Sequence, residues 1–216
     1  MQNIKGVIFD LDGTLIDSMW MWGEVAENFL LSRGVTPRPD FRAAIRPFNA
    51  VEEAQYYINE YGVDLPLEEV ITGRDDLMLE FLTRDVELKA GTMSVLNALQ
   101  ERGIKMCIAT ATERRLAEPV LQLHEMTDYF ERVFICSEEN TSKSSPDMFI
   151  RAAEFLGTDI GYTLVVEDIL CAIKTAKKAG FIVAGVYDKA SDDHQNEIKA
   201  LCDYYWKYPG EMLEYL

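Results

Sequence analysis

The spacing of apolar and polar residues changes twice along the chain. Residues 5–9 predict a buried strand, and Gly13 and Thr14 supply a turn after it. From residue 18 to 88 the apolar positions follow helical spacing, and no segment alternates as a strand does. The helices predicted there cover residues 18–33, 50–61 and 66–84. We therefore expect an all-helical insert after the first strand.

The rest of the chain alternates between helix and strand patterns. Helices are predicted at 92–103, 113–126, 146–157 and 170–180, and strands at 104–110, 132–137, 162–168, 181–187 and 202–207. Pro119 falls in the middle of the second of these helices. Such alternation predicts an α/β fold, a three-layer Rossmann-like core with a parallel sheet. We assign residues 1–17 and 89–216 to this core and residues 18–88 to the insert.

Polar residues stand where the predicted strands end. They are Asp10 and Asp12 after the first strand, Thr110, the Glu167-Asp168 pair, and Lys143 in a loop before a helix. Taken singly, the threonine suits a helix cap, the lysine a solvated loop and the acidic pair an exposed turn. The carboxyl ends of parallel strands, however, meet at one edge of the sheet, where such folds bind ligands. We expect these groups to converge there.

This set of side chains suits phosphoryl transfer. Carboxylate oxygens are the ligands that Mg²⁺ prefers, and the cation would relieve the repulsion between neighbouring aspartates. Asp10 can attack phosphorus to form an aspartyl-phosphate, while Asp12 protonates the leaving oxygen and later activates water. Lys143 and the Thr110 hydroxyl would bind the transferring phosphoryl oxygens.

Composition narrows the choice of partners. The net charge of −16 argues against nucleic acid and anionic membranes, so the expected partner is a small phosphorylated metabolite. The four cysteines are far apart and form no CxxC pair, which fits reduced thiols in the cytoplasm. No signal peptide and no apolar run of membrane-spanning length is recognised. We expect a cytoplasmic monomer and leave a dimer open.

Four segments together resemble the motifs of the haloacid dehalogenase superfamily, in the order of that family. They are "DLDGTLIDS", "CIATAT" with Thr110, "SKSSPDMF" with Lys143, and "VVEDILCAIKTAKKAG" with Glu167 and Asp168. The helical insert between the first two motifs is similar to the cap of β-phosphoglucomutase and phosphoglycolate phosphatase-like enzymes. Ala90, Ile169 and Ala172 depart from the family's usual residues, and none of the three replaces a reactive group.

The resemblance assigns a role to each of these site residues. It implies that Asp10 is the nucleophile and a metal ligand, and that Asp12 is the general acid/base and binds the metal through its backbone carbonyl. Asp168 would complete the metal site, with Glu167 in its outer shell. The phosphate would be held by Thr110, Ala111 and Lys143. The cofactor implied is Mg²⁺.

Other reactions of the superfamily are less consistent with this sequence. Asp12 favours phosphoesters over dehalogenation, because a halide leaves without a proton. Residues 18–88 contain no lysine that could form the Schiff base of phosphonate cleavage. Glu113 favours a phosphatase, while a sugar-phosphate mutase and a non-catalytic regulator stay as alternatives. The insert carries six arginines, of which Arg42 and Arg46 are the candidates for binding a second anionic group of the substrate.

Overall fold

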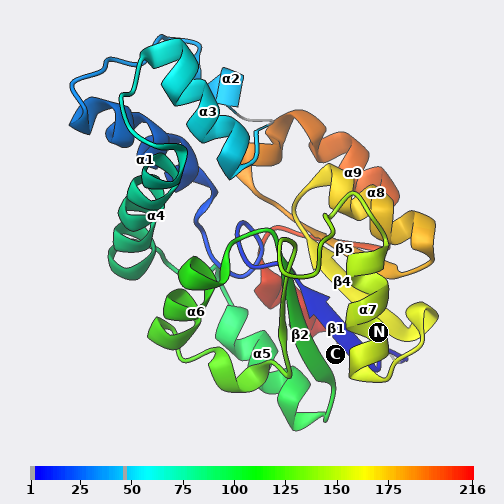
Figure 1. The fold of residues 1–216 in the computed structure, drawn as a ribbon. Helices are drawn as coiled ribbons and strands as arrows, with labels where there is room; N and C mark the ends of the chain where they lie inside the picture. Colours follow the sequence, from blue (N-terminus) through cyan, green and yellow to red (C-terminus); the bar gives the residue numbers. More distant parts are fainter. Residues whose placement is uncertain (1–2, 46–47) are drawn as a thin grey trace. The chain divides into compact units, whose positions relative to one another are not determined.

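In the described part of the chain, six parallel strands form one sheet in the order β3-β2-β1-β4-β5-β6 (Figure 1). The computed structural model describes residues 3–45 and 48–216. The strands are β1 (Gly6–Phe9), β2 (Lys105–Thr110), β3 (Val133–Ile135), β4 (Thr163–Glu167), β5 (Ile182–Val186) and β6 (Tyr204–Trp206). Every residue of β1 and β4 is buried, which explains the apolar sequence of β1 and the apolar centre of β4 at residues 164–166. The predicted parallel sheet is confirmed.

Helices cover both faces of this sheet and complete the expected three layers. The helices of the core are α5 (Thr92–Glu101), α6 (Arg114–Leu123), α7 (Asp147–Leu156), α8 (Leu170–Ala179) and α9 (Gln195–Leu201). Helices α7 and α8 pack on strands β1, β2, β4 and β5, and their apolar residues share one buried cluster with the sheet. Helix α5 lies on the other side of the sheet, against the 3-10 segment Pro209–Tyr215 (Figure 1).

Contacts divide the chain into two units, Met1–Met19 with Val86–Leu216, and Trp20–Asp85. The second unit contains α2 (Phe41–Ile45), α3 (Ala50–Tyr61) and α4 (Leu67–Arg84), and nearly all of α1 (Met19–Ser32). Its described residues form helices and loops without a strand. Aromatic and aliphatic side chains share its core, where the ring of Tyr57 lies 5.7 Å from that of Phe29 and 5.8 Å from that of Phe41. No described helix has the length and apolar character needed to cross a membrane.

Some short elements were not predicted. Helix α2 has five residues and α9 has seven, so neither is long enough to show clear helical spacing. Pro119 lies inside α6, and the helix continues through it to Leu123. One lost backbone donor is tolerated there, while Leu116, Ala117, Val120 and Leu121 are buried on the inner face.

Candidate active site

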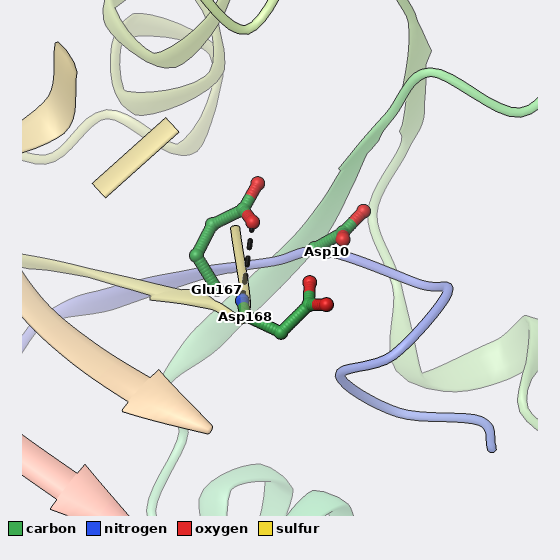
Figure 2. A group of neighbouring side chains, drawn as sticks. All are labelled: Asp10, Glu167 and Asp168. Carbon is green, nitrogen blue, oxygen red and sulfur yellow. Dashed lines mark hydrogen bonds between the residues drawn. The ribbon is translucent and has the colours of Figure 1, made fainter. Parts of the chain in front are cut away.

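Three carboxyl groups meet at the carboxyl edge of the sheet (Figure 2). Asp10 follows β1, Glu167 ends β4 and Asp168 comes next in the chain. Strands β1 and β4 are neighbours with Phe9 opposite Val166, so the register sets Asp10 beside Glu167. One oxygen from each of the three groups lies within 4.8 Å of the others, and all three side chains are buried. This acidic cluster is the strongest candidate for a site in the described residues.

Lys143 is the cation that the structure sets against the acidic cluster. Its ammonium contacts the carboxylate of Asp10 and lies 2.7 Å from Oε1 of Glu167. The lysine side chain is only 9% exposed, although it comes from a loop rich in serine. The fold therefore brings together residues from three separate segments of the sequence. A solvated loop lysine, the simpler alternative, does not describe this side chain.

Burial changes the proton affinities of these groups. Burial and the nearby charge of Glu167 raise the pKa of Asp10 to about 6. Burial, with Asp10 and Glu167, also raises the pKa of Asp168 well above its usual range. Burial alone would lower the pKa of Lys143, but the carboxylates of Asp10 and Glu167 outweigh it and raise that pKa. In the folded protein, ionisation of Asp10 and Asp168 is therefore disfavoured, while the charge of Lys143 is stabilised.

The acidic cluster fits a hard divalent cation. Oδ2 of Asp168 is buried and has no hydrogen-bond partner among the described residues. Oδ1 of the same carboxyl is 3.5 Å from the Thr14 hydroxyl, which is a long contact. A buried carboxylate oxygen without a partner is costly. Because the donors are all oxygens, Mg²⁺ is a suitable ion to satisfy it.

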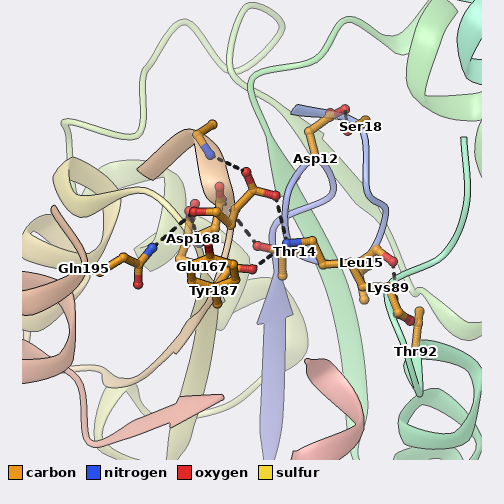
Figure 3. Close-up of polar contacts among 12 residues, drawn as sticks. Asp12, Thr14, Leu15, Ser18, Lys89, Thr92, Glu167, Asp168, Tyr187 and Gln195 are labelled. Atoms are coloured by element: carbon orange, nitrogen blue, oxygen red, sulfur yellow. Dashed lines mark hydrogen bonds and ion pairs between the residues drawn. The ribbon is translucent and has the colours of Figure 1, made fainter. Parts of the chain in front are cut away.

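Two hydroxyl groups orient the carboxylate of Asp12. The Ser18 hydroxyl donates to Oδ1 at 2.5 Å (Figure 3). The Thr112 hydroxyl donates to Oδ2 at 2.6 Å. Burial raises the pKa of Asp12, and these hydrogen bonds oppose that shift. The side chain is therefore oriented and has a raised proton affinity, as a general acid requires.

Thr110 and Ala111 complete the edge on the other side of β1. Thr110 ends β2, which pairs with β1, and its buried hydroxyl accepts the backbone N–H of Thr112 at 3.0 Å. Ala111 follows and is exposed. Sequence reasoning did not identify Ser18 and Thr112 as partners of Asp12. The usable signal was that both are hydroxyl residues close in sequence to the predicted site.

A family model of haloacid dehalogenase-like hydrolases matches residues 4–180, which include every residue of this site. The chain belongs to the haloacid dehalogenase-like hydrolases. The resemblance stated from the four motifs is thereby confirmed.

Two curated relatives of this haloacid dehalogenase-like hydrolase are phosphatases from Arabidopsis thaliana. (DL)-glycerol-3-phosphatase 1, mitochondrial, is 32% identical over 198 residues, 88% of this chain and 66% of its own length. The chain thus spans just under two thirds of that relative. (DL)-glycerol-3-phosphatase 2 is 30% identical over 203 residues, 90% of this chain and 84% of its own length. The expected enzyme class, a phosphatase, is confirmed by these relatives.

The same haloacid dehalogenase-like fold is found in a crystal structure of CbbY from Rhodobacter sphaeroides in complex with phosphate. The two chains superpose with a TM-score of 0.83 at 17% identity, over 97% of this chain and 96% of that one. At this identity the likeness shows the fold alone.

The arginines of the insert are mostly engaged with acids inside the helical unit of this hydrolase. Arg42 forms two hydrogen bonds of 2.7 Å with Glu27 and stays half exposed. Arg46 lies outside the described residues. Arg74 is buried, with Glu53 at 3.0 Å and Asp75 at 2.5 Å. Of the two candidate arginines, Arg42 is thus already paired with Glu27 in this structure.

Gly13 leaves room for the carboxylate of Asp168. Its φ is +78°, a conformation that glycine adopts without strain. A Cβ at this position would lie 2.8 Å from Cγ of Asp168 and 2.8 Å from Cγ of Met19. The turn after β1 therefore packs directly on Asp168, and any side chain there would displace it.

Replacing Gly13 with alanine is expected to lower kcat by about 10²-fold, the cost of shifting a catalytic group by about 1 Å. Gly103→Ala is the matched control, because Gly103 has φ +66° and a Cβ added there would meet nothing within 4 Å. Both variants carry the backbone strain of about 1–2 kcal/mol, but only the first disturbs Asp168. Steady-state kinetics and thermal unfolding of both variants check this. Equal activity in the two variants would contradict the role given to Gly13.

Proposed function

We propose that this chain is a Mg²⁺-dependent phosphatase that hydrolyses a small phosphorylated metabolite through an aspartyl-phosphate on Asp10. The observation that carries the proposal is the buried cluster of Asp10, Glu167 and Asp168 with the Lys143 ammonium among them. Asp12, two residues from the nucleophile, supports it with a raised pKa. The proposed enzyme acts in the cytoplasm as a monomer or dimer, without nucleic acid or membrane.

In the first half of the reaction, a carboxylate oxygen of Asp10 attacks phosphorus. The bond from phosphorus to the ester oxygen breaks, and Asp12 donates its proton to that oxygen. Lys143 already contacts Asp10, so its ammonium is near any phosphoryl group attached there. With the Thr110 hydroxyl and the exposed chain at Ala111, it would hold the phosphoryl oxygens.

In the second half, Asp12 takes a proton from water, and this water attacks the phosphorus of the aspartyl-phosphate. Inorganic phosphate leaves and both aspartates return to their starting states. Asp10, Asp168 and the backbone carbonyl of Asp12 would hold Mg²⁺, with Glu167 outside them. When bound, the ion neutralises negative charge on the phosphoryl oxygens. Oδ2 of Asp168 is suited to bind the ion, because it has no hydrogen-bond partner among the residues that the structure describes.

The names of the relatives support one class of candidate substrate. Two of them are named for glycerol 3-phosphate, so small polyol phosphates lead the list of candidate substrates. Glu113 is the residue that favours hydrolysis over a mutase reaction. Its carboxylate accepts a hydrogen bond of 2.8 Å from the Ser137 hydroxyl.

Phosphate release from glycerol 3-phosphate, phosphoglycolate, sugar phosphates, nucleotides and p-nitrophenyl phosphate tests the proposal. We expect turnover with Mg²⁺ and a rate at least about 10²-fold lower with EDTA, since the cation contributes several kcal/mol of charge stabilisation. Restoring Mg²⁺ should restore the rate. A folded, Mg²⁺-loaded protein that releases phosphate from none of these compounds would contradict a phosphatase. Conversion between sugar-phosphate isomers in that case would indicate a mutase.

A further inference from the structure

Lys89 and Asp188 form a buried ion pair outside the acidic cluster. Lys89 Nζ lies 2.8 Å from Oδ2 of Asp188, and the two side chains are 7% and 6% exposed. The residues are 99 positions apart in sequence. Lys89 stands where the chain re-enters the core unit after the helical unit, and Asp188 follows β5. Neither residue has a part in the reaction described above.

The loop after β5 surrounds this ion pair with further hydrogen bonds. Lys89 Nζ also donates to the backbone carbonyl of Tyr187 at 2.7 Å. The second carboxylate oxygen of Asp188 accepts the N–H of Ala190 at 2.8 Å. The amide of Gln195 donates to the Asp188 carbonyl at 3.2 Å. Both charges are therefore satisfied in one fixed geometry.

The backbone around Lys89 holds the turn that follows β1. The N–H of Lys89 donates to the carbonyl of Leu15 at 3.0 Å, and the Thr92 hydroxyl donates to the same carbonyl at 2.9 Å (Figure 3). The residue before Leu15 is Thr14, whose hydroxyl faces Asp168. A continuous series of contacts thus joins Asp188, through Lys89 and Leu15, to the metal-site carboxylate.

We propose that Lys89 and Asp188 are positioning residues of the active site. Their ion pair anchors the returning chain to the loop after β5, and through Leu15 it holds the turn at residues 13–15 against Asp168. A buried ion pair contributes little stability compared with apolar side chains of similar size. Its value here lies in directional contacts, which an apolar pair does not provide. The inference rests on the proposed function for its kinetic test, but not for its metal-binding test.

Lys89→Met is expected to lower kcat by about 10²-fold with little change in KM, because the substrate contacts are untouched. It should also raise by about tenfold the Mg²⁺ concentration that gives half of the cation-induced rise in Tm, measured without substrate. Lys177→Met is the matched control. Lys177 pairs with Asp203, also at 2.8 Å, but that pair is partly exposed and has no contact with Leu15. The control should keep wild-type kcat and Mg²⁺ response.

The double variant Lys89→Met, Asp188→Leu separates positioning from stability. Without a lone buried charge its Tm should return close to the wild-type value, whereas kcat and the Mg²⁺ response should stay impaired. Recovery of all three would overturn the proposal, as would a wild-type Mg²⁺ response in both variants. Asp188→Asn keeps the size of the side chain and tests the same response if Lys89→Met does not fold. If the wild type releases no phosphate, the proposed function fails, and the Mg²⁺-dependent Tm still decides this inference.

Discussion

Asp10→Asn should abolish phosphate release while leaving the protein folded. The amide keeps the size of the side chain but cannot attack phosphorus, so the aspartyl-phosphate does not form. Loss of a catalytic nucleophile costs on the order of 10⁶ in the best-measured hydrolases. We therefore expect kcat with p-nitrophenyl phosphate and with the best substrate of the panel to fall by at least about 10⁴-fold.

The same substitution should not destabilise the protein at pH 7 in the absence of divalent cations. Burial and Glu167 raise the pKa of Asp10 to about 6, above the value of 3.8 for an unperturbed aspartate. As pH rises through this interval, the folded protein must ionise a group that prefers to stay protonated, so the free energy of unfolding falls. Asparagine does not carry that charge. The Tm of the Asp10→Asn variant should therefore equal or exceed that of the wild type.

Asp203→Asn is the control for Asp10→Asn. Asp203 also pairs with a lysine, Lys177, but at a partly exposed position away from the cluster. It should retain full activity. Near wild-type turnover in Asp10→Asn would exclude Asp10 as the nucleophile. An inactive variant that is also unfolded by circular dichroism would contradict the expected stability.

The sheet and the meeting of the polar groups could be predicted from sequence because both follow from local patterns. Each strand is short, apolar and bounded by turns, so its end is visible in the sequence. Parallel pairing then brings Asp10 and Glu167 together whatever the details of packing. The place of Lys143 in the site could not be predicted in this way, because its loop is polar and predicts a solvated side chain. Only its position in a family motif indicated that it belongs to the buried site.

The partners of individual side chains were beyond the same reasoning. Thr112 donates to Asp12 from 100 positions away in the sequence, so tertiary packing sets that contact. Ser18 is only six residues from Asp12, but its hydroxyl reaches the carboxylate only because the turn after β1 folds it back. The Lys89–Asp188 pair depends in the same way on how the loop after β5 folds back. Polar contacts between distant segments leave no periodic trace, whereas strands and helices do.

Asp12→Asn should separate substrates by their leaving groups. An alkoxide leaves from phosphorus only with a proton, and general acid catalysis contributes about 10²–10⁴-fold. We expect kcat/KM for glycerol 3-phosphate or a sugar phosphate to fall by this amount. For p-nitrophenyl phosphate kcat/KM should fall far less, because the nitrophenolate leaves unprotonated. The quantity kcat/KM reports the steps up to the first irreversible one, which is the transfer of the phosphoryl group to Asp10.

The second half of the reaction should also reveal the loss of Asp12. Asparagine cannot take a proton from water, so the aspartyl-phosphate should accumulate and p-nitrophenolate should appear as a burst of about one equivalent per enzyme. Asp17→Asn, an exposed aspartate on the same segment, controls for the loss of one negative charge and should show no burst. Equal losses of kcat/KM for alkyl and aryl phosphates would rule out Asp12 as the acid. A burst together with a wild-type kcat/KM for alkyl phosphates would instead confine Asp12 to the activation of water.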